Sequence, residues 1–200
     1  MEYLVSMTTQ VPEGTSQAEV NDIRTREAAN SRRLAERKQL LRLWRPPLQP
    51  GEWRTLGLFA AQDAARLEDV LSSMPLRVWR SDEVTPLTPH PNDPGPASGA
   101  SGAAKEFLVA FAPASPWDAT SQAMRDATAA EAVSAKALAG QGHLMRLWNT
   151  PGEGHALGLW RARDATEMQT VLDSLPLAPW LSMKTTPLSE HPSDPRPVRS

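Results

Sequence analysis

Residues 51–94 read GEWRTLGLFAAQDAARLEDVLSSMPLRVWRSDEVTPLTPHPNDP, and residues 152–195 read GEGHALGLWRARDATEMQTVLDSLPLAPWLSMKTTPLSEHPSDP. About half of the positions are identical without a gap. The match continues upstream, where LRLWR (41–45) corresponds to MRLWN (145–149). A repeat of about 95 residues is too long for a solenoid and has the size of a small domain. The chain is therefore predicted to hold two tandem domains.

The stretch between the copies is PGPASGASGAA, residues 94–104, whose Gly, Ala and Ser content is typical of a flexible linker. The predicted organisation is a domain over 1–93, a linker over 94–104 and a second domain over 105–195. Two independent domains and a fused pair are both compatible with this pattern. The fused pair is favoured because small sheets leave edges and faces that need covering.

Both copies show the same order of predicted elements. In the first copy, residues 2–8 alternate as a strand, and Thr15 or Ser16 caps a helix that runs to about Gln39, with Glu19 completing a capping box. Strands over 40–45 and 54–60, a helix over 63–73 and a strand over 77–84 follow. This β-α-β-β-α-β order is ferredoxin-like. The predicted class is α+β, with two tandem ferredoxin-like domains forming a pseudo-dimer similar to a dimeric α/β-barrel.

Composition excludes several classes. The 200 residues are 40% hydrophobic and 22% charged, as in globular proteins, and no apolar run is long enough for a membrane span. A net charge of −2 without a basic patch disfavours nucleic acid as a partner. The lack of cysteine excludes disulfides and thiolate sites, and the four scattered histidines predict no metal site. The start of the chain has no signal-peptide pattern, so a cytoplasmic location is expected.

The most informative residue is a carboxylate on an apolar helix stripe. Glu27 lies seven residues after Val20 and seven before Leu34, and Glu131 repeats this position in the second copy. A half-buried carboxyl has its pKa raised towards neutrality, which suits a general acid or base. The alternative is a structural ion pair with Arg24 or Arg26. Glu27 and Glu131 are the catalytic candidates.

Further candidates lie near the strand ends. Arg45 and Trp53 flank a Pro-rich loop, and an arginine with an aromatic side chain near a carboxylate can hold an anionic organic substrate. His90 and His191 each stand in a His-Pro-x-Asp-Pro tail, where either a base paired with Asp or a structural turn is possible. His90 is taken as a substrate-binding candidate together with Arg24, Arg45 and Trp53.

These residues resemble the muconolactone Δ-isomerase family. The resemblance rests on the EYLVSMT opening, the mid-helix Glu, the LWR strand, and the tails SMPLRVW…VTPLTPHPNDP and SLPLAPW…TTPLSEHPSDP. It implies a ferredoxin-like, oligomer-forming enzyme that shifts a double bond in an unsaturated γ-lactone by proton transfer, without metal or cofactor. The family's Glu falls on Glu27 and Glu131.

The two copies match the family's other site positions unequally. A basic residue three positions before the Glu is Arg24 in the first copy and Thr128 in the second. The strand arginine and the loop aromatic fall on Arg45 and Trp53, but on Asn149 and Gly154 in the second copy. The resemblance thus implies a more complete first site and a small-molecule partner, an unsaturated lactone or enone. A natural-product cyclase or isomerase and a non-catalytic ligand-binding or assembly protein remain alternatives.

Overall fold

The computed structural model describes residues 1–95, 104–114 and 121–195, and it contains the same six-element order twice. The first half holds β1 (Glu2–Thr9), α1 (Gln17–Glu36), β2 (Leu40–Arg45), β3 (Arg54–Ala60), α2 (Ala64–Ser72) and β4 (Arg80–Pro89). The second half holds β5 (Lys105–Pro113), α3 (Gln122–Gly140), β6 (Leu144–Asn149), β7 (Ala156–Ala162), α4 (Ala165–Asp173) and β8 (Leu181–Glu190). The α+β class and the repeated β-α-β-β-α-β order are confirmed.

Two compact units divide the chain, and their limits differ from those of the sequence repeat. Unit 1 comprises Met1–Leu87 together with the chain from Ser189 onward, and unit 2 comprises Thr88–Leu188. Each unit therefore includes a short tail that belongs to the other copy in sequence: the tail that starts at Ser189 in unit 1, and the tail that starts at Thr88 in unit 2. The predicted linker over 94–104 lies for the most part outside the described residues.

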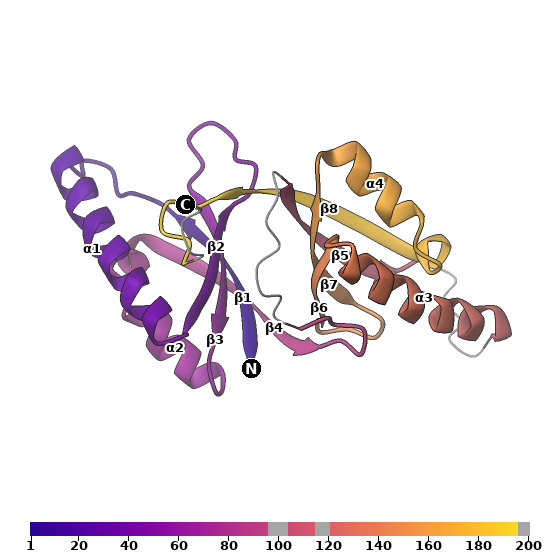
Figure 1. Cartoon of the computed structure of the whole chain (residues 1–200). Coiled ribbons are helices and arrows are strands. Elements are labelled where there is room, and N and C mark those ends of the chain that lie inside the picture. The colour runs from indigo at the N-terminus through magenta and orange to yellow at the C-terminus, as the bar shows by residue number, and fades with distance from the viewer. Residues whose placement is uncertain (96–103, 115–120, 196–200) are drawn as a thin grey trace. The chain divides into compact units, whose positions relative to one another are not determined.

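Unit 1 is an antiparallel sheet covered on one face by two helices. The central strand β1 pairs with β3 and β4, and β3 also pairs with β2. Figure 1 shows α1 and α2 on the same face of this sheet. The core between them combines alternate residues of β1 with one side of each helix: Tyr3, Val5, Met7, Leu34, Leu67 and Leu71. Unit 2 repeats this arrangement with β5, β7, β8 and β6.

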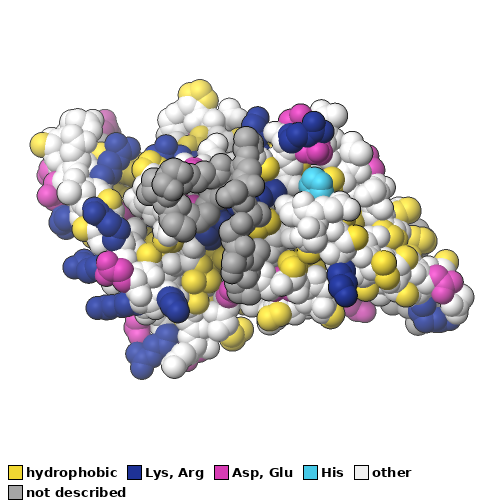
Figure 2. Space-filling view, viewed as in Figure 1, with side chains coloured by type: hydrophobic (Ala, Val, Ile, Leu, Met, Phe, Trp, Pro, Cys, Tyr) yellow, Lys and Arg dark blue, Asp and Glu magenta, His cyan; other side chains and the backbone are white. Residues whose placement is uncertain are grey.

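The capping box predicted for α1 is present. Ser16 caps the helix by accepting a hydrogen bond from the Glu19 backbone, and the Glu19 carboxylate accepts one from the Ser16 backbone. Figure 2 shows Lys and Arg side chains along α1 with Asp and Glu among them, a mixed surface rather than a basic stripe. In the described part of the chain, no helix is long and apolar enough to span a membrane.

The last strand of each copy begins later and ends later than the prediction of 77–84. Residues Pro75–Trp79 form a 3-10 turn, because Pro75 sets the helical φ at its start and Arg77 N–H donates to the Met74 carbonyl. Strand β4 then runs from Arg80 to Pro89, where Pro89 pairs with Trp148 of β6. Strand β8 likewise pairs its end with β2, Glu190 opposite Trp44. This turn and these tails supply groups to the pockets of the two units.

Candidate active site

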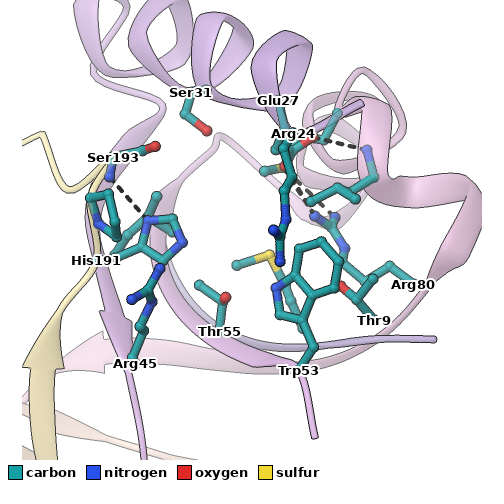
Figure 3. A pocket seen from close by; sticks show the side chains of 16 residues that line it. Thr9, Arg24, Glu27, Ser31, Arg45, Trp53, Thr55, Arg80, His191 and Ser193 are labelled. Atoms are coloured by element: carbon teal, nitrogen blue, oxygen red, sulfur yellow. Dashed lines mark hydrogen bonds and ion pairs between the residues drawn. The ribbon is translucent and has the colours of Figure 1, made fainter. Parts of the chain in front are cut away.

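Unit 1 contains a pocket of about 320 Å³ between α1, the sheet and the 191–193 tail. Figure 3 shows that its polar side chains converge from separate elements. The groups most relevant to chemistry are Arg24, Glu27, Arg45, Trp53, Arg80 and His191. The structure therefore brings four of the predicted residues of the first copy, Arg24, Glu27, Arg45 and Trp53, into one cavity.

Glu27 is the carboxylate of this pocket. Its side chain is 13% exposed, and its Oε2 accepts a hydrogen bond of 2.9 Å from the Leu76 backbone N–H. That N–H is available because Leu76 lies in the 3-10 turn before β4. Burial raises the pKa of Glu27, while the Leu76 hydrogen bond and the Arg80 charge oppose the rise. The carboxyl is thus positioned by the fold and is easier to protonate than an exposed glutamate.

Arg80 is a buried cation that the sequence reasoning missed. Its side chain is 2% exposed, and Asp82 holds its Nε and Nη2 at 2.6 and 2.9 Å. The remaining nitrogen, Nη1, lies 3.6 Å from Glu27 Oε1. Asp82 also accepts from Arg77, so the cation is held by an ion-pair network. The available signal was the difference between the copies, since the second copy has Leu181 and Met183 at these two positions.

Arg24 and Trp53 form one wall of the pocket. The Arg24 guanidinium carbon lies 4.4 Å from the centre of the Trp53 ring, a cation–π contact that orients both side chains. Arg45, at the end of β2, lies across the pocket beside His191 (Figure 3). Arg24 and Arg45 are both exposed, so their charges are available to a ligand that enters from solvent. The pocket thus combines one carboxylate with three cations.

The histidine in this pocket is His191, whereas His90 lines the pocket of unit 2. The structure separates His90 from the three residues predicted to act with it, because each tail belongs to the unit formed by the other copy. His191 Nδ1 accepts a hydrogen bond from Ser193 N–H at 3.1 Å, so the neutral ring carries its proton on Nε2. Burial, and then the charge of Arg45, lower the pKa of His191 to about 4. At neutral pH His191 is therefore an uncharged hydrogen-bond donor.

Each tail is fastened by its aspartate. Asp194 is fully buried, contacts Arg42 at 3.2 Å and accepts a 2.9 Å hydrogen bond from the Leu43 backbone. In unit 2, Asp93 makes the same contacts with Arg146 and the Leu147 backbone. The tail aspartates thus bind arginine and backbone of strands β2 and β6. These contacts position His191 and His90.

Replacing Asp194 with Ala is expected to lower the free energy of unfolding by about 3 kcal/mol, because it removes one partner of a buried ion pair. It should also weaken ligand binding to unit 1, since the tail that carries His191 loses its anchor. Asp93→Ala is the matched control, with a similar cost in stability but no effect on the unit 1 site. Urea unfolding and ligand titration of both variants measure this. Equal effects of the two variants on ligand binding to unit 1 would contradict the role of Asp194 as the anchor of the tail that carries His191.

Unit 2 has a smaller pocket of about 220 Å³ around Glu131. Glu131 Oε2 accepts a hydrogen bond of 3.0 Å from Leu177 N–H, as Glu27 does from Leu76. Burial raises the pKa of Glu131 as well. The two candidate carboxylates therefore occupy equivalent positions, but in different surroundings. Within the described residues, no cluster of three His, Asp or Glu could hold a metal ion.

Comparison with known proteins matches both copies to one protein family. The model of the muconolactone delta-isomerase family matches residues 1–93 and 105–194. A muconolactone Delta-isomerase of Cupriavidus pinatubonensis is 32% identical over 92 residues, which are 46% of this chain and 97% of that protein. A muconolactone Delta-isomerase 1 of Acinetobacter lwoffii is 29% identical over 92 residues, 46% of this chain and 93% of its own.

A solved structure aligns with both copies of the repeat at once. A mutant chlorite dismutase from Candidatus Nitrospira defluvii aligns with a TM-score of 0.58 over 94% of this chain and 91% of its own, at 13% identity. At that identity the likeness concerns the fold alone. It agrees with a chain built from two β-α-β-β-α-β units.

Proposed function

Since the chain belongs to the muconolactone delta-isomerase family, we propose that unit 1 isomerises a small unsaturated lactone that carries a carboxylate. Glu27 removes a proton from a ring carbon and returns it two carbons away, which moves the double bond. The observation that carries this proposal is the half-buried Glu27 carboxyl, with its raised pKa, in a pocket lined by three arginines. No cofactor takes part in this scheme.

The reaction conserves charge and atoms within the pocket. Glu27 starts as a carboxylate and takes the acidic proton of the γ carbon, which the ring double bond conjugates to the carbonyl, and this leaves a dienolate. The negative charge thus moves from Glu27 to the substrate. Arg80, whose Nη1 lies 3.6 Å from Glu27 Oε1, stays in place. A fixed cation near the developing charge lowers the barrier. The protonated Glu27 then donates the same proton to the far carbon and is a carboxylate again.

The remaining polar groups suit recognition of the substrate. Arg24 and Arg45 provide cations for the substrate carboxylate at the exposed side of the pocket. His191 offers a neutral Nε2–H donor for a ring or carbonyl oxygen. Trp53 supplies an apolar wall whose position Arg24 supports. The groups that bind charge and the group that moves the proton are therefore separate.

The size of the cavity favours a small lactone over a large natural product. A volume of about 320 Å³ lies at the lower end of the range for small-molecule sites. Trp53 is only half-buried and leaves the pocket open, which argues against a structural role for the pocket.

A solvent-exchange assay tests this function. The protein is mixed in deuterium oxide with γ-carboxymethylbutenolide, an unsaturated lactone with one carboxylate, and followed by proton NMR. Protein-dependent movement of the double bond, with loss of the acidic ring C–H signal as that proton is transferred or exchanged with solvent, supports the proposal. If neither this lactone nor its uncharged γ-methyl analogue isomerises or exchanges, the pocket is a non-catalytic binding site instead.

The rate should fall as the pH is lowered through the pKa of Glu27, because only the carboxylate accepts a proton. Burial raises that pKa, so the midpoint of the acid limb of kcat/KM should lie above 4.5. His191, with its pKa of about 4, titrates below this limb. Initial rates in buffers from pH 4 to pH 8 measure the midpoint of this acid limb. A midpoint at or below 4.5 would contradict Glu27 as the base.

A further inference from the structure

The pocket of unit 2 retains the carboxyl and the histidine of the unit 1 pocket. Glu131 keeps the backbone hydrogen bond from the residue that corresponds to Leu76. His90 keeps its geometry too, since its Nδ1 accepts from Asn92 N–H at 3.1 Å and leaves Nε2–H as a donor. Burial also lowers the pKa of His90, which favours the neutral ring. The pocket thus preserves an acid–base group and a neutral donor.

Every arginine of the unit 1 pocket is absent from the unit 2 pocket. Thr128, Asn149 and Leu181 stand where Arg24, Arg45 and Arg80 stand in the first copy, and all three line the pocket. The described lining residues of this pocket include no Lys or Arg.

Two further polar positions have become apolar. Ser31 and Thr55, which line the first pocket, correspond to Ala135 and Ala156 in the second. Phe111 and Trp160 add an aromatic wall, with ring centres 6.3 Å apart. The indole nitrogen of Trp160 is buried without a hydrogen-bond partner. The lining is therefore that of a site for an apolar ligand with one or two acceptor atoms.

A ligand carboxylate would be unfavourable in this pocket. It would lose water without gaining a lysine or arginine partner, and the ionised form of Glu131 would repel it. An uncharged ring loses little solvation and gains contacts with the aromatic wall. Its carbonyl oxygen can accept a hydrogen bond from His90 Nε2–H or the Asn149 amide. The charge of the ligand, rather than its ring, is what the two pockets distinguish.

We propose that the pocket of unit 2 is a second ligand site, and that it takes an uncharged unsaturated lactone without the carboxylate that unit 1 binds. The lactone ring rests on the proposed function of the family site. The absence of charge rests on the unit 2 pocket alone. The chain thus combines two sites of one ancestry with opposite preference for ligand charge.

Indole N–H signals in a ¹H–¹⁵N NMR spectrum can report the two pockets separately, because Trp53 lines one and Trp160 lines the other. Trp160→Phe assigns the second signal, and Phe59 at the matched position shows that the fold accepts Phe there. Trp53→Phe assigns the first. The titrations use the full-length Glu27→Gln variant at pH 8, because the slow turnover expected of unit 1 in this variant leaves the probes intact.

The probes are γ-methylbutenolide and γ-carboxymethylbutenolide. The neutral probe should shift the Trp160 signal with at least tenfold higher affinity than the carboxylate does, and the carboxylate should act first on Trp53. No Trp160 shift with the neutral probe, or equal affinity for both probes, overturns the inference. A neutral probe that binds unit 2 supports it even if unit 1 shows no isomerase activity, so the two proposals fail separately.

The variant Asn149→Arg tests the cause of the preference. It restores the arginine of the first copy at a rim position where Arg45 is exposed, so the fold should accept it. The affinity of unit 2 for the carboxylate probe should rise about tenfold, with the Trp53 response unchanged. An unchanged affinity for the carboxylate would overturn charge as the basis of selection.

Discussion

Replacing Glu27 with Gln is expected to lower kcat by about 1,000-fold, because a general acid–base group contributes about 100- to 10,000-fold to a proton transfer. The amide keeps an oxygen that can accept the Leu76 hydrogen bond, so the helix and the turn should keep their positions. It cannot take up the substrate proton. The exchange assay in deuterium oxide measures the loss directly.

The fold should tolerate this change. The pKa of Glu27 is higher in the folded protein than its ordinary value, so ionisation is less favourable there than in the unfolded chain. The stability associated with Glu27 is therefore fully present below the unfolded pKa and is lost as pH rises through the folded pKa. At pH 7 the uncharged amide of the Glu27→Gln variant should leave the free energy of unfolding unchanged or higher.

Glu131→Gln is the matched control, since Glu131 accepts the equivalent backbone hydrogen bond from Leu177 and has a raised pKa but no arginine in its pocket. Turnover of the carboxylate-bearing lactone should remain within about twofold of the parent protein, because the unit 1 site is intact. Full activity of Glu27→Gln, or equal losses in both variants, would remove Glu27 as the proton carrier of this reaction.

The second large effect is expected from replacing Arg80 and Asp82 together, as Arg80→Leu with Asp82→Met. Removing a group that stabilises developing negative charge costs about 100- to 1,000-fold in kcat. Replacing both partners avoids leaving Asp82 buried without its closest partner. The second copy carries Leu181 and Met183 at these positions of the corresponding strand β8, which shows that the fold accepts an apolar pair.

The pH profile separates this role of Arg80 from a purely structural one. The charge of Arg80 lowers the pKa of Glu27 more strongly than that of Asp82 raises it. Loss of both should therefore raise the pKa further and move the acid limb of kcat/KM to higher pH. A kcat within about threefold of the parent protein and an unmoved acid limb would show that Arg80 serves the fold only.

The amino-acid sequence by itself determined the repeat, the element order and the candidate carboxylates. Alternation in the first strand and the Ser16 capping box are local patterns, and the structure has both where they were predicted. Glu27 was visible because its spacing from Val20 and Leu34 placed a charge on an apolar stripe. Such signals depend on neighbours within a few helical turns, so they can be read without knowing the fold.

Only the tertiary structure decided which groups meet in a pocket. The sequence predicts that His90 binds substrate together with Arg24, Arg45 and Trp53. The histidine that lines their pocket is His191, which lies 101 positions after His90 in the chain. Arg80 gave no local signal, because its role depends on Asp82, Met74 and Glu27 around it, and only the difference between the two copies marked its position. Burial, ion pairing and the assignment of each tail to a unit arise from contacts between distant segments. No local pattern encodes these contacts, and in this protein they determine the charge of each site.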